Sequence, residues 1–196
     1  LINLCCTQTV THQTMDGYMK QQGFTLIELT TTMAVMLIIS SINMGDFRAL
    51  LHQSQANSDI SDLLLQVRTT RQYAITYSQH AVLCPSNNQQ DCINDWKAPR
   101  MIFLDSNNNK KRDAYEAIEH RFKALLDRDI LISYPKTQIR FNNQGIANYY
   151  NGTLAYCSEN IVYGLVISRL GRIRVAQDLD GDHNPDVNNH TAVKCS

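Results

Sequence analysis

The sequence has no excess of charge of either sign, because its 196 residues include 18 Lys or Arg and 18 Asp or Glu. A neutral chain argues against a generic basic nucleic-acid binder, so any anion binding must come from a local cluster of cations. The sequence also lacks a Ser/His/Asp or Cys/His arrangement and a glycine-rich phosphate loop, and its six His form no ligand-like cluster. We therefore predict neither an enzyme nor a cofactor.

Helix breakers are missing from a long stretch of the chain. No Pro or Gly occurs between Asp46 and Ser78, and apolar residues recur there at steps of three and four, which is typical of an amphipathic helix. The preceding apolar run, residues 24–42, would span roughly 28 Å as a helix, enough to cross the hydrocarbon core of a membrane. We predict one helix from Phe24 to Tyr77, with a transmembrane half at 24–45 and an amphipathic half at 46–78.

Short extended segments follow the predicted helix. Turn signals separate them, among them Tyr134-Pro135 and Asn151-Gly152. Many short strands after one helix predict an α+β fold, in which residues 79–196 form an antiparallel β domain of two packed sheets. The predicted strands are 81–84, 101–104, 121–125, 130–134, 138–141, 153–157, 164–168 and 172–176.

Four cysteines lie in the predicted β domain: Cys84, Cys92, Cys157 and Cys195. An even number suits an oxidising, extracytoplasmic compartment. Four cysteines allow three pairings, and we favour Cys84 with Cys92, which closes a short loop, and Cys157 with Cys195, which ties the C-terminal tail to a strand. Zinc is a weaker interpretation because no Cys-x₂-Cys spacing is present.

The N-terminal apolar run carries a carboxylate. Residues Gly23 to Glu28 read Gly-Phe-Thr-Leu-Ile-Glu, and a charge inside a bilayer costs about 2.5–3.5 kcal/mol even on mild scales, so Glu28 is expected to have a partner. This motif resembles the processing site of type IV pilins and type II secretion pseudopilins. The resemblance implies that a prepilin peptidase cuts between Gly23 and Phe24 and methylates Phe24. It also implies that Glu28 pairs with a neighbouring pilin's N-terminal amine during assembly.

The residues up to and including Gly23 are then a leader, 1–23. Residues 1–18 are polar without basic character, whereas Met19 to Gly23 alone would make a short leader with one positive charge. We expect the protein to start at Met19, which would leave Cys5 and Cys6 outside it.

The rest of the chain narrows the resemblance. Four later stretches resemble the subfamily that contains the pseudopilin GspH and the minor pilin FimT. They are Val67 to Pro85, Ile139-Arg140-Phe141, Thr153 to Cys157 and Val166 to Val175. The last stretch resembles the Gly-Arg-x-Arg motif of FimT proteins, minor pilins implicated in DNA capture for natural transformation.

That stretch predicts a hairpin in which Gly171 takes the left-handed conformation of a type I turn with a bulge. The period of two would put Arg172 and Arg174 on one face, with Arg169 near the turn. Three guanidiniums there would form a phosphate clamp that ignores base sequence, and Lys194 could join it through the second disulfide. The alternative is an edge hairpin whose arginines only discourage strand pairing.

Two acidic loops invite a calcium interpretation. The first, 105–116, has Lys110 where an EF-hand loop needs Gly, so we interpret it as a solvated loop. The second, Asp178 to Asp186, is denser in carboxylates. Calcium is an open alternative there, although we predict no metal. Tyr149-Tyr150 is the one tyrosine pair whose pattern suggests base stacking, whereas Trp96 is predicted to be a core or rim residue.

We therefore expect a minor type IV pilin that binds extracellular DNA non-specifically through Arg169, Arg172 and Arg174. It would be anchored by one span in the inner membrane before assembly, and would then be extracellular in the pilus or at its tip. Its expected partners are DNA, other pilins along the N-terminal helix, and the prepilin peptidase. The alternatives are a GspH-like pseudopilin without a DNA role and a calcium-dependent adhesive tip subunit.

Overall fold

The computed structural model describes residues 23–42, 44–125, 129–158, 161–182, 184–188 and 191–195. The chain divides into two compact units, residues 1–46 and 47–196. The expected leader, the start at Met19, and Cys5 and Cys6 lie outside the described residues. So does Asn43, which stands between helix α1, Leu26–Ile42, and helix α2, Met44–Thr76.

Helix α1 is apolar on all sides, and its large side chains are exposed. The backbone amide of Glu28 lies 3.3 Å from the hydroxyl oxygen of Thr25, as in a helix N-cap. Three successive threonine hydroxyls, from Thr30 to Thr32, donate to carbonyl oxygens one turn earlier, so they are satisfied inside the helix. Over the described ranges, no helix combines the length and the apolarity that a membrane crossing requires.

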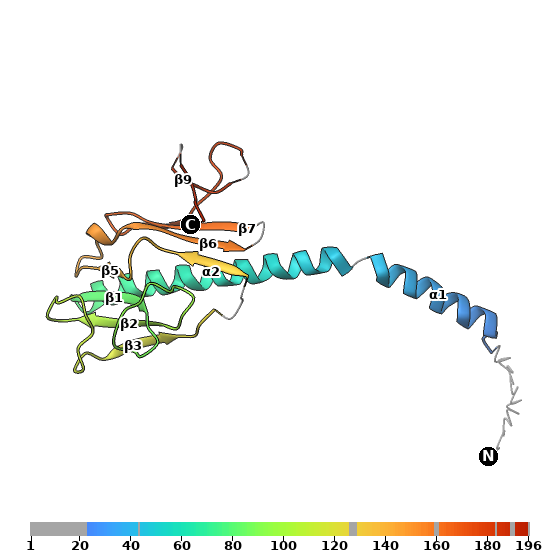
Figure 1. Cartoon of the computed structure of the whole chain (residues 1–196), viewed down its shortest axis with the longest axis horizontal. Coiled ribbons are helices and arrows are strands. Elements are labelled where there is room, and N and C mark those ends of the chain that lie inside the picture. Colours follow the sequence, from blue (N-terminus) through green and yellow to red (C-terminus); the bar gives the residue numbers. More distant parts are fainter. Residues whose placement is uncertain are drawn as a thin grey trace, which may run out of the picture. The chain divides into compact units, whose positions relative to one another are not determined.

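The second unit holds two four-stranded antiparallel sheets, and α2 runs alongside them (Figure 1). The strand orders are β3-β2-β1-β5 and β4-β6-β7-β8, and β9 pairs with β10 separately. The first sheet consists of β1 His80–Pro85, β2 Arg100–Asp105, β3 Ile118–Phe122 and β5 Ile139–Phe141. The second consists of β4 Ile130–Ser133, β6 Gly152–Ser158, β7 Ile161–Ile167 and β8 Ile173–Val175. Strands β9 and β10 are Asp186–Asn188 and Thr191–Ala192, and a 3₁₀ helix, η1, spans Asn148–Tyr150.

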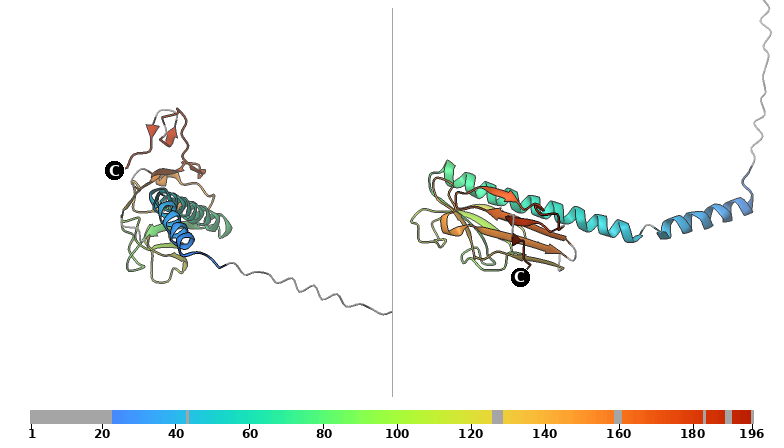
Figure 2. Two further views of the ribbon diagram at one scale, coloured as in Figure 1. Left: turned by 90° about the vertical axis from the view of Figure 1, so that its right-hand side faces the viewer. Right: turned by 90° about the horizontal axis from the view of Figure 1, so that it is seen from above.

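Helix α2 runs along the β domain in the view from above (Figure 2). The main core is made of side chains from α2 and from both sheets. The helix contributes side chains at helical spacing, and each sheet contributes one face of alternating residues. Trp96 is fully buried in this core, so it is a core residue. The buried α2 side chains in this cluster are Ala56, Ile60, Leu63, Val67 and Ala74.

Two buried polar contacts fix the position of α2 on the sheets. The hydroxyl of Tyr156 on β6 donates to the Asp59 carboxylate at 3.0 Å. The Arg100 guanidinium on β2 donates to the side-chain oxygen of Gln66 at 2.8 Å and to three backbone carbonyls. Burial lowers the pKa of Arg100 to about 10, so Arg100 remains charged at neutral pH. These contacts satisfy groups that would otherwise be costly to bury.

The predicted α+β fold with two antiparallel sheets is confirmed. The strand predicted at 121–125 is wrong, because β3 spans Ile118–Phe122. This edge strand has no fully buried side chain and therefore no clear alternation to read. The sequence also gave no signal for β9 and β10, which are only three and two residues long. Tyr77, the predicted last residue of the helix, directly follows the end of α2 at Thr76 and is 49% exposed.

Candidate anion-binding site

The Gly-Arg-x-Arg stretch forms the turn between β7 and β8. The Gly171 amide donates to the Ser168 carbonyl, and the Ser168 amide donates to the Arg172 carbonyl, both at 2.9 Å. Gly171 has a φ of 80°, which a residue with a side chain adopts only at a cost. This is the predicted type I turn followed by a glycine bulge. The Ser168 hydroxyl accepts the Arg172 amide and closes the turn further.

The turn packs on the loop that follows β5. Gly145 in that loop also has a positive φ, of 74°. A Cβ atom at Gly171 would stand 1.9 Å from the Gly145 carbonyl oxygen, so only glycine fits there. The Arg71 Nε on α2 donates to the same oxygen at 2.9 Å. The hairpin, the 142–150 segment and α2 therefore meet at one point.

Three arginines surround a depression at this junction. Arg68 and Arg71 reach it from α2 and Arg172 from the hairpin, with Gln72, Leu170, Gly171 and Ile173 completing the wall. The depression, here called the arginine pocket, encloses about 450 Å³, and over the described part of the chain no carboxylate lines it. Arg68 and Arg172 are exposed and Arg71 is half-buried. A cluster of guanidiniums without counter-charges is suited to phosphate oxygens, which each planar fork can grip in pairs.

The remaining predicted cations lie elsewhere. The Arg174 guanidinium is half-buried and donates to the Val187 carbonyl on β9. It does not line the arginine pocket, so the expected shared face of Arg172 and Arg174 is not what the structure shows. The physical reason is that β8 begins at Ile173, after the bulge, so the period of two does not extend back to Arg172. Arg169 is exposed at the turn, and its carbonyl accepts the Asn148 amide at 3.0 Å. Lys194 lines a separate depression that also includes Val187.

Sequence reasoning missed Arg68 and Arg71. They are three residues apart and therefore lie on one side of α2, which is the only signal that the sequence offered. Their contact with a turn about a hundred residues later depends on how the sheets place that turn, and no local pattern encodes such a contact.

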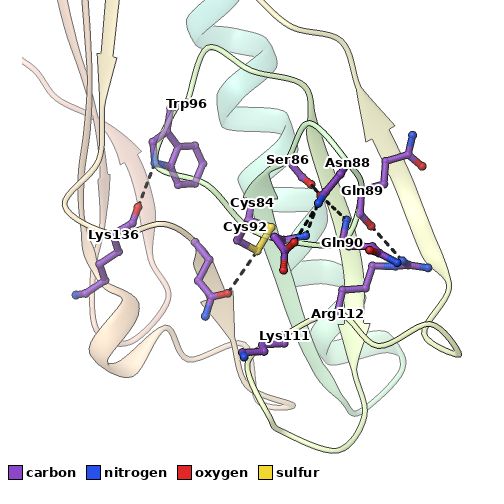
Figure 3. The surroundings of a disulfide bond; sticks show 12 residues. Cys84, Ser86, Asn88, Gln89, Gln90, Cys92, Trp96, Lys111, Arg112 and Lys136 are labelled. Carbon is purple, nitrogen blue, oxygen red and sulfur yellow. Dashed lines mark hydrogen bonds between the residues drawn. A yellow bond between two sulfur atoms is a disulfide. The ribbon is translucent and has the colours of Figure 1, made fainter.

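Both expected disulfides are present. Cys84 and Cys92 close the loop after β1, and Cys157 on β6 is joined to Cys195 in the C-terminal tail. Figure 3 shows the first of these, where Asn88 accepts the amides of Gln90 and Asp91, and Arg112 donates to the Gln89 carbonyl. The loop is therefore cross-linked both covalently and by hydrogen bonds.

The first acidic loop agrees only in part with the prediction of a solvated loop. Residues 106–111, Ala114 and Tyr115 are exposed, whereas Asp105 and Glu116 at the two ends are buried. Asp105 forms an ion pair with Arg140 at 2.8 Å, and Glu116 accepts the Ser106 and Asp113 amides. Arg140 and amides of the loop itself thus partner the two carboxylates that would bind calcium in an EF-hand. In the second loop, carboxylate oxygens of Asp178, Asp180 and Asp186 lie within 4.8 Å of one another.

At the N-terminus, Gly23, Phe24 and Glu28 are all exposed, and Phe24 is 82% exposed. Glu28 lies in the first turn of α1, where the helix dipole favours a carboxylate. These three residues are therefore accessible on the described chain.

The chain matches two family models and is similar to solved structures. The family model for type II transport protein GspH matches residues 59–171, and the prokaryotic N-terminal methylation motif matches residues 18–42. The crystal structure of the type IV minor pilin FimU from Pseudomonas aeruginosa strain PAO1, in space group P21, is similar with a TM-score of 0.52 and 14% identity. That similarity covers 65% of this chain and 92% of FimU. For FimU in space group P65 the TM-score is 0.47 at 16% identity, covering 64% and 92%.

No curated protein sequence matches the chain. At these identities the crystal structures show the fold alone, whereas the GspH model covers more than half of the chain. The match includes Arg68 and Arg71 and ends at Gly171, one residue before Arg172. The chain belongs to the type IV pilin-like family of type II transport protein GspH.

Proposed function

We propose that this protein is a minor type IV pilin that binds extracellular DNA without sequence preference for uptake in natural transformation. The observation that carries the proposal is the arginine pocket, where Arg68, Arg71 and Arg172 converge and no carboxylate lines the wall. The neutral chain offers no general attraction for DNA, so a local cluster of this kind is what binding requires. Contacts to phosphates carry no base information, which makes such binding independent of sequence.

The N-terminal segment supports the placement in a filament. The methylation motif covers residues 18–42, which include Gly23, Phe24 and Glu28. In this proposal a prepilin peptidase cleaves after Gly23 and methylates Phe24, the segment anchors the protein in the inner membrane, and Glu28 pairs with another pilin's terminal amine during assembly. The chain is then extracellular in the pilus or at its tip.

A structural pseudopilin is the second candidate. The matching family model is that of a type II transport protein, and such a subunit needs no DNA contact. It would leave the convergence of Arg68, Arg71 and Arg172 without a ligand. Binding of DNA therefore separates the two candidates.

The test is a titration of the full-length chain, held in a mild detergent, with labelled duplex DNA over a range of salt. Each phosphate neutralised adds about −0.9 to the slope of log affinity against log salt, so the pocket predicts roughly −2 to −3. Changing Arg68→Gln with Arg172→Gln is expected to lower the magnitude of the slope by roughly 2 and to remove most binding.

The matched control is Arg48→Gln with Arg121→Gln, which removes the same charge from two exposed arginines outside the pocket. We expect it to leave the slope unchanged. If the control pair lowers binding as much as the pocket pair, charge alone and not the pocket accounts for the affinity. If the wild type binds no DNA at low salt, the structural pseudopilin is the better interpretation.

A further inference from the structure

A second basic depression is lined in part by residues of the 142–150 segment. It encloses about 480 Å³, and its wall includes Lys110, Lys136, Arg140, Tyr149 and Tyr150. Among the residues that the structure describes, no carboxylate lines it. We call it the tyrosine pocket. Unlike the arginine pocket, it combines cations with aromatic rings.

Arg140 on β5 forms the buried part of this pocket. Its side chain is only 6% exposed, and it is fixed by the ion pair with Asp105 and by donation to the Asn108 side-chain oxygen at 2.6 Å. The Arg140 Nε is buried and has no hydrogen-bond partner among the residues that the structure describes. A buried donor without a partner is costly in a protein interior. Because this Nε is shielded from solvent, a ligand in the pocket meets Arg140 only as a fixed part of the wall.

The two tyrosines have different roles in the wall. Tyr150 is held in place, because its hydroxyl accepts from the Gln138 side-chain amide at 3.3 Å and its ring lies 5.9 Å from the Arg140 guanidinium carbon. Tyr149 is 75% exposed at the centre of η1. An exposed ring on a short, hydrogen-bonded helical turn is a preorganised surface for stacking.

The hairpin connects the two pockets. Leu170, Gly171 and Arg172 line the arginine pocket, whereas the preceding Arg169 carbonyl binds the amide of Asn148, a residue that lines the tyrosine pocket. The exposed Arg169 side chain starts between them. A strand of phosphates held by Arg172 can therefore continue past Arg169 towards Lys110 and Lys136.

We propose that the tyrosine pocket binds an unpaired nucleobase of single-stranded DNA by stacking on Tyr149, with the flanking phosphates on Lys110 and Lys136. The ion pair with Asp105 holds Arg140 in place, so the base meets a rigid wall. Bases in a duplex are already stacked and paired, so they cannot enter. The protein therefore prefers single strands, or frayed ends, to intact duplex. This inference rests on the proposed DNA binding and specifies the form of DNA.

The experiment titrates the full-length chain in detergent with three labelled probes of equal length. They are an oligothymidylate of about 12 nucleotides, within the footprint of one single-strand-binding fold, its duplex with oligoadenylate, and an abasic strand that carries the phosphates without bases. The variants are Tyr149→Ala, Tyr149→Trp and, as the matched control, Tyr77→Ala, an exposed tyrosine that lines neither pocket.

We expect the wild type to bind the oligothymidylate at least roughly fivefold more tightly than the duplex or the abasic strand, the lower limit for one stacked base. Tyr149→Ala is expected to remove that advantage without changing duplex binding, and Tyr149→Trp and Tyr77→Ala to preserve it. Equal wild-type affinity for single strand and duplex overturns the proposal. So does a loss in Tyr149→Ala that is the same for the abasic strand, because the pocket would then contact only phosphate or sugar.

Failure of this inference is distinguishable from failure of the proposed function. One outcome is a wild type that binds the duplex with the expected salt slope but shows no advantage for the oligothymidylate. That result supports the role proposed for the arginine pocket and overturns the role proposed for the tyrosine pocket. A wild type that binds none of the three probes overturns both.

Discussion

The backbone of Gly171 rests against the backbone of Gly145, so that a Cβ atom at position 171 would stand 1.9 Å from the Gly145 carbonyl oxygen. The two glycines come from the β7–β8 turn and from the loop after β5, and Arg71 of α2 donates to the shared oxygen. This contact positions Arg172 beside Arg68 and Arg71. The glycine of the Gly-Arg-x-Arg stretch thus acts on the basic cluster through packing as well as through its turn conformation.

Replacing Gly171 and, as a comparison, Gly181 separates the effect of packing from the effect of the turn conformation. Gly171→Ala has to accept both a left-handed conformation and the clash, whereas Gly181→Ala has a similar φ, 85°, with open space around it. We expect Gly181→Ala to lower the free energy of unfolding by about 1–2 kcal/mol and Gly171→Ala by more than about 3 kcal/mol. Denaturant titration of both variants measures the difference. Equal losses would mean that the 145–171 contact yields without cost.

Substitutions of Arg172 and Arg174 are predicted to have different effects, the first on DNA binding and the second on stability. Arg172 is exposed in the arginine pocket, so Arg172→Gln is expected to reduce the salt slope of DNA binding by roughly 1 with little change in stability. Arg174 donates to the Val187 carbonyl, so Arg174→Gln is expected to cost about 1 kcal/mol of stability and little DNA affinity. Paired DNA and denaturant titrations check this. The opposite ranking would restore the shared arginine face that strand periodicity predicted.

Strand positions were predictable where a sheet face is buried. β1, β2 and β6 alternate or run apolar because one or both faces are covered, and these strands were found within two residues of their ends. β3 lies at an edge, with side chains that are exposed or half-buried, so its sequence carries little pattern. β9 and β10 are held by the tail disulfide and by the packing of Val193 on Ala155 and Ala176, which are tertiary effects.

The candidate site was only partly predictable for the same reason. The turn was predicted correctly, because Gly171, which lies between Arg169 and Arg172, favours a specific local conformation. Its neighbours could not be read, since the contact of Gly171 with Gly145 joins segments that the sequence keeps far apart. The bulge that the turn requires also shifted Arg172 out of the strand and away from Arg174.

The two disulfides are expected to differ in their contribution to stability. Cys157 and Cys195 are 38 residues apart and Cys84 and Cys92 only 8. Loop-closure entropy then predicts losses of about 4 and about 2.5 kcal/mol when each pair is changed to serine. Removing the longer link should also expose the 177–195 segment to proteolysis, because Cys195 ties that tail to β6. Denaturant titration and limited proteolysis test this, and an intact tail in the Cys157→Ser, Cys195→Ser variant would show that the packing of Val193 suffices.

Glu28 gives the sharpest test of the filament role. Its carboxylate is exposed in the first turn of α1, and no ion pair to it is found among the described residues. A carboxylate in an apolar segment favours a partner with a positive charge. In the filament role that we propose, this partner is the terminal amine of a neighbouring subunit. We expect Glu28→Ala to be inserted in the membrane and cleaved to a chain beginning at Phe24, since the change makes the segment more apolar. It should nevertheless be absent from sheared filaments.

Thr31→Ala is the matched control for this change. It alters a side chain one turn away on the same helix, whose hydroxyl only donates to the Glu28 carbonyl. We expect it to be cleaved and incorporated normally. Intact-mass measurement of the membrane fraction reads cleavage, and immunoblotting of the filaments reads incorporation. Normal incorporation of Glu28→Ala would rule out the carboxylate as the assembly contact. An uncleaved chain in both variants and in the wild type would instead contradict the processing site between Gly23 and Phe24.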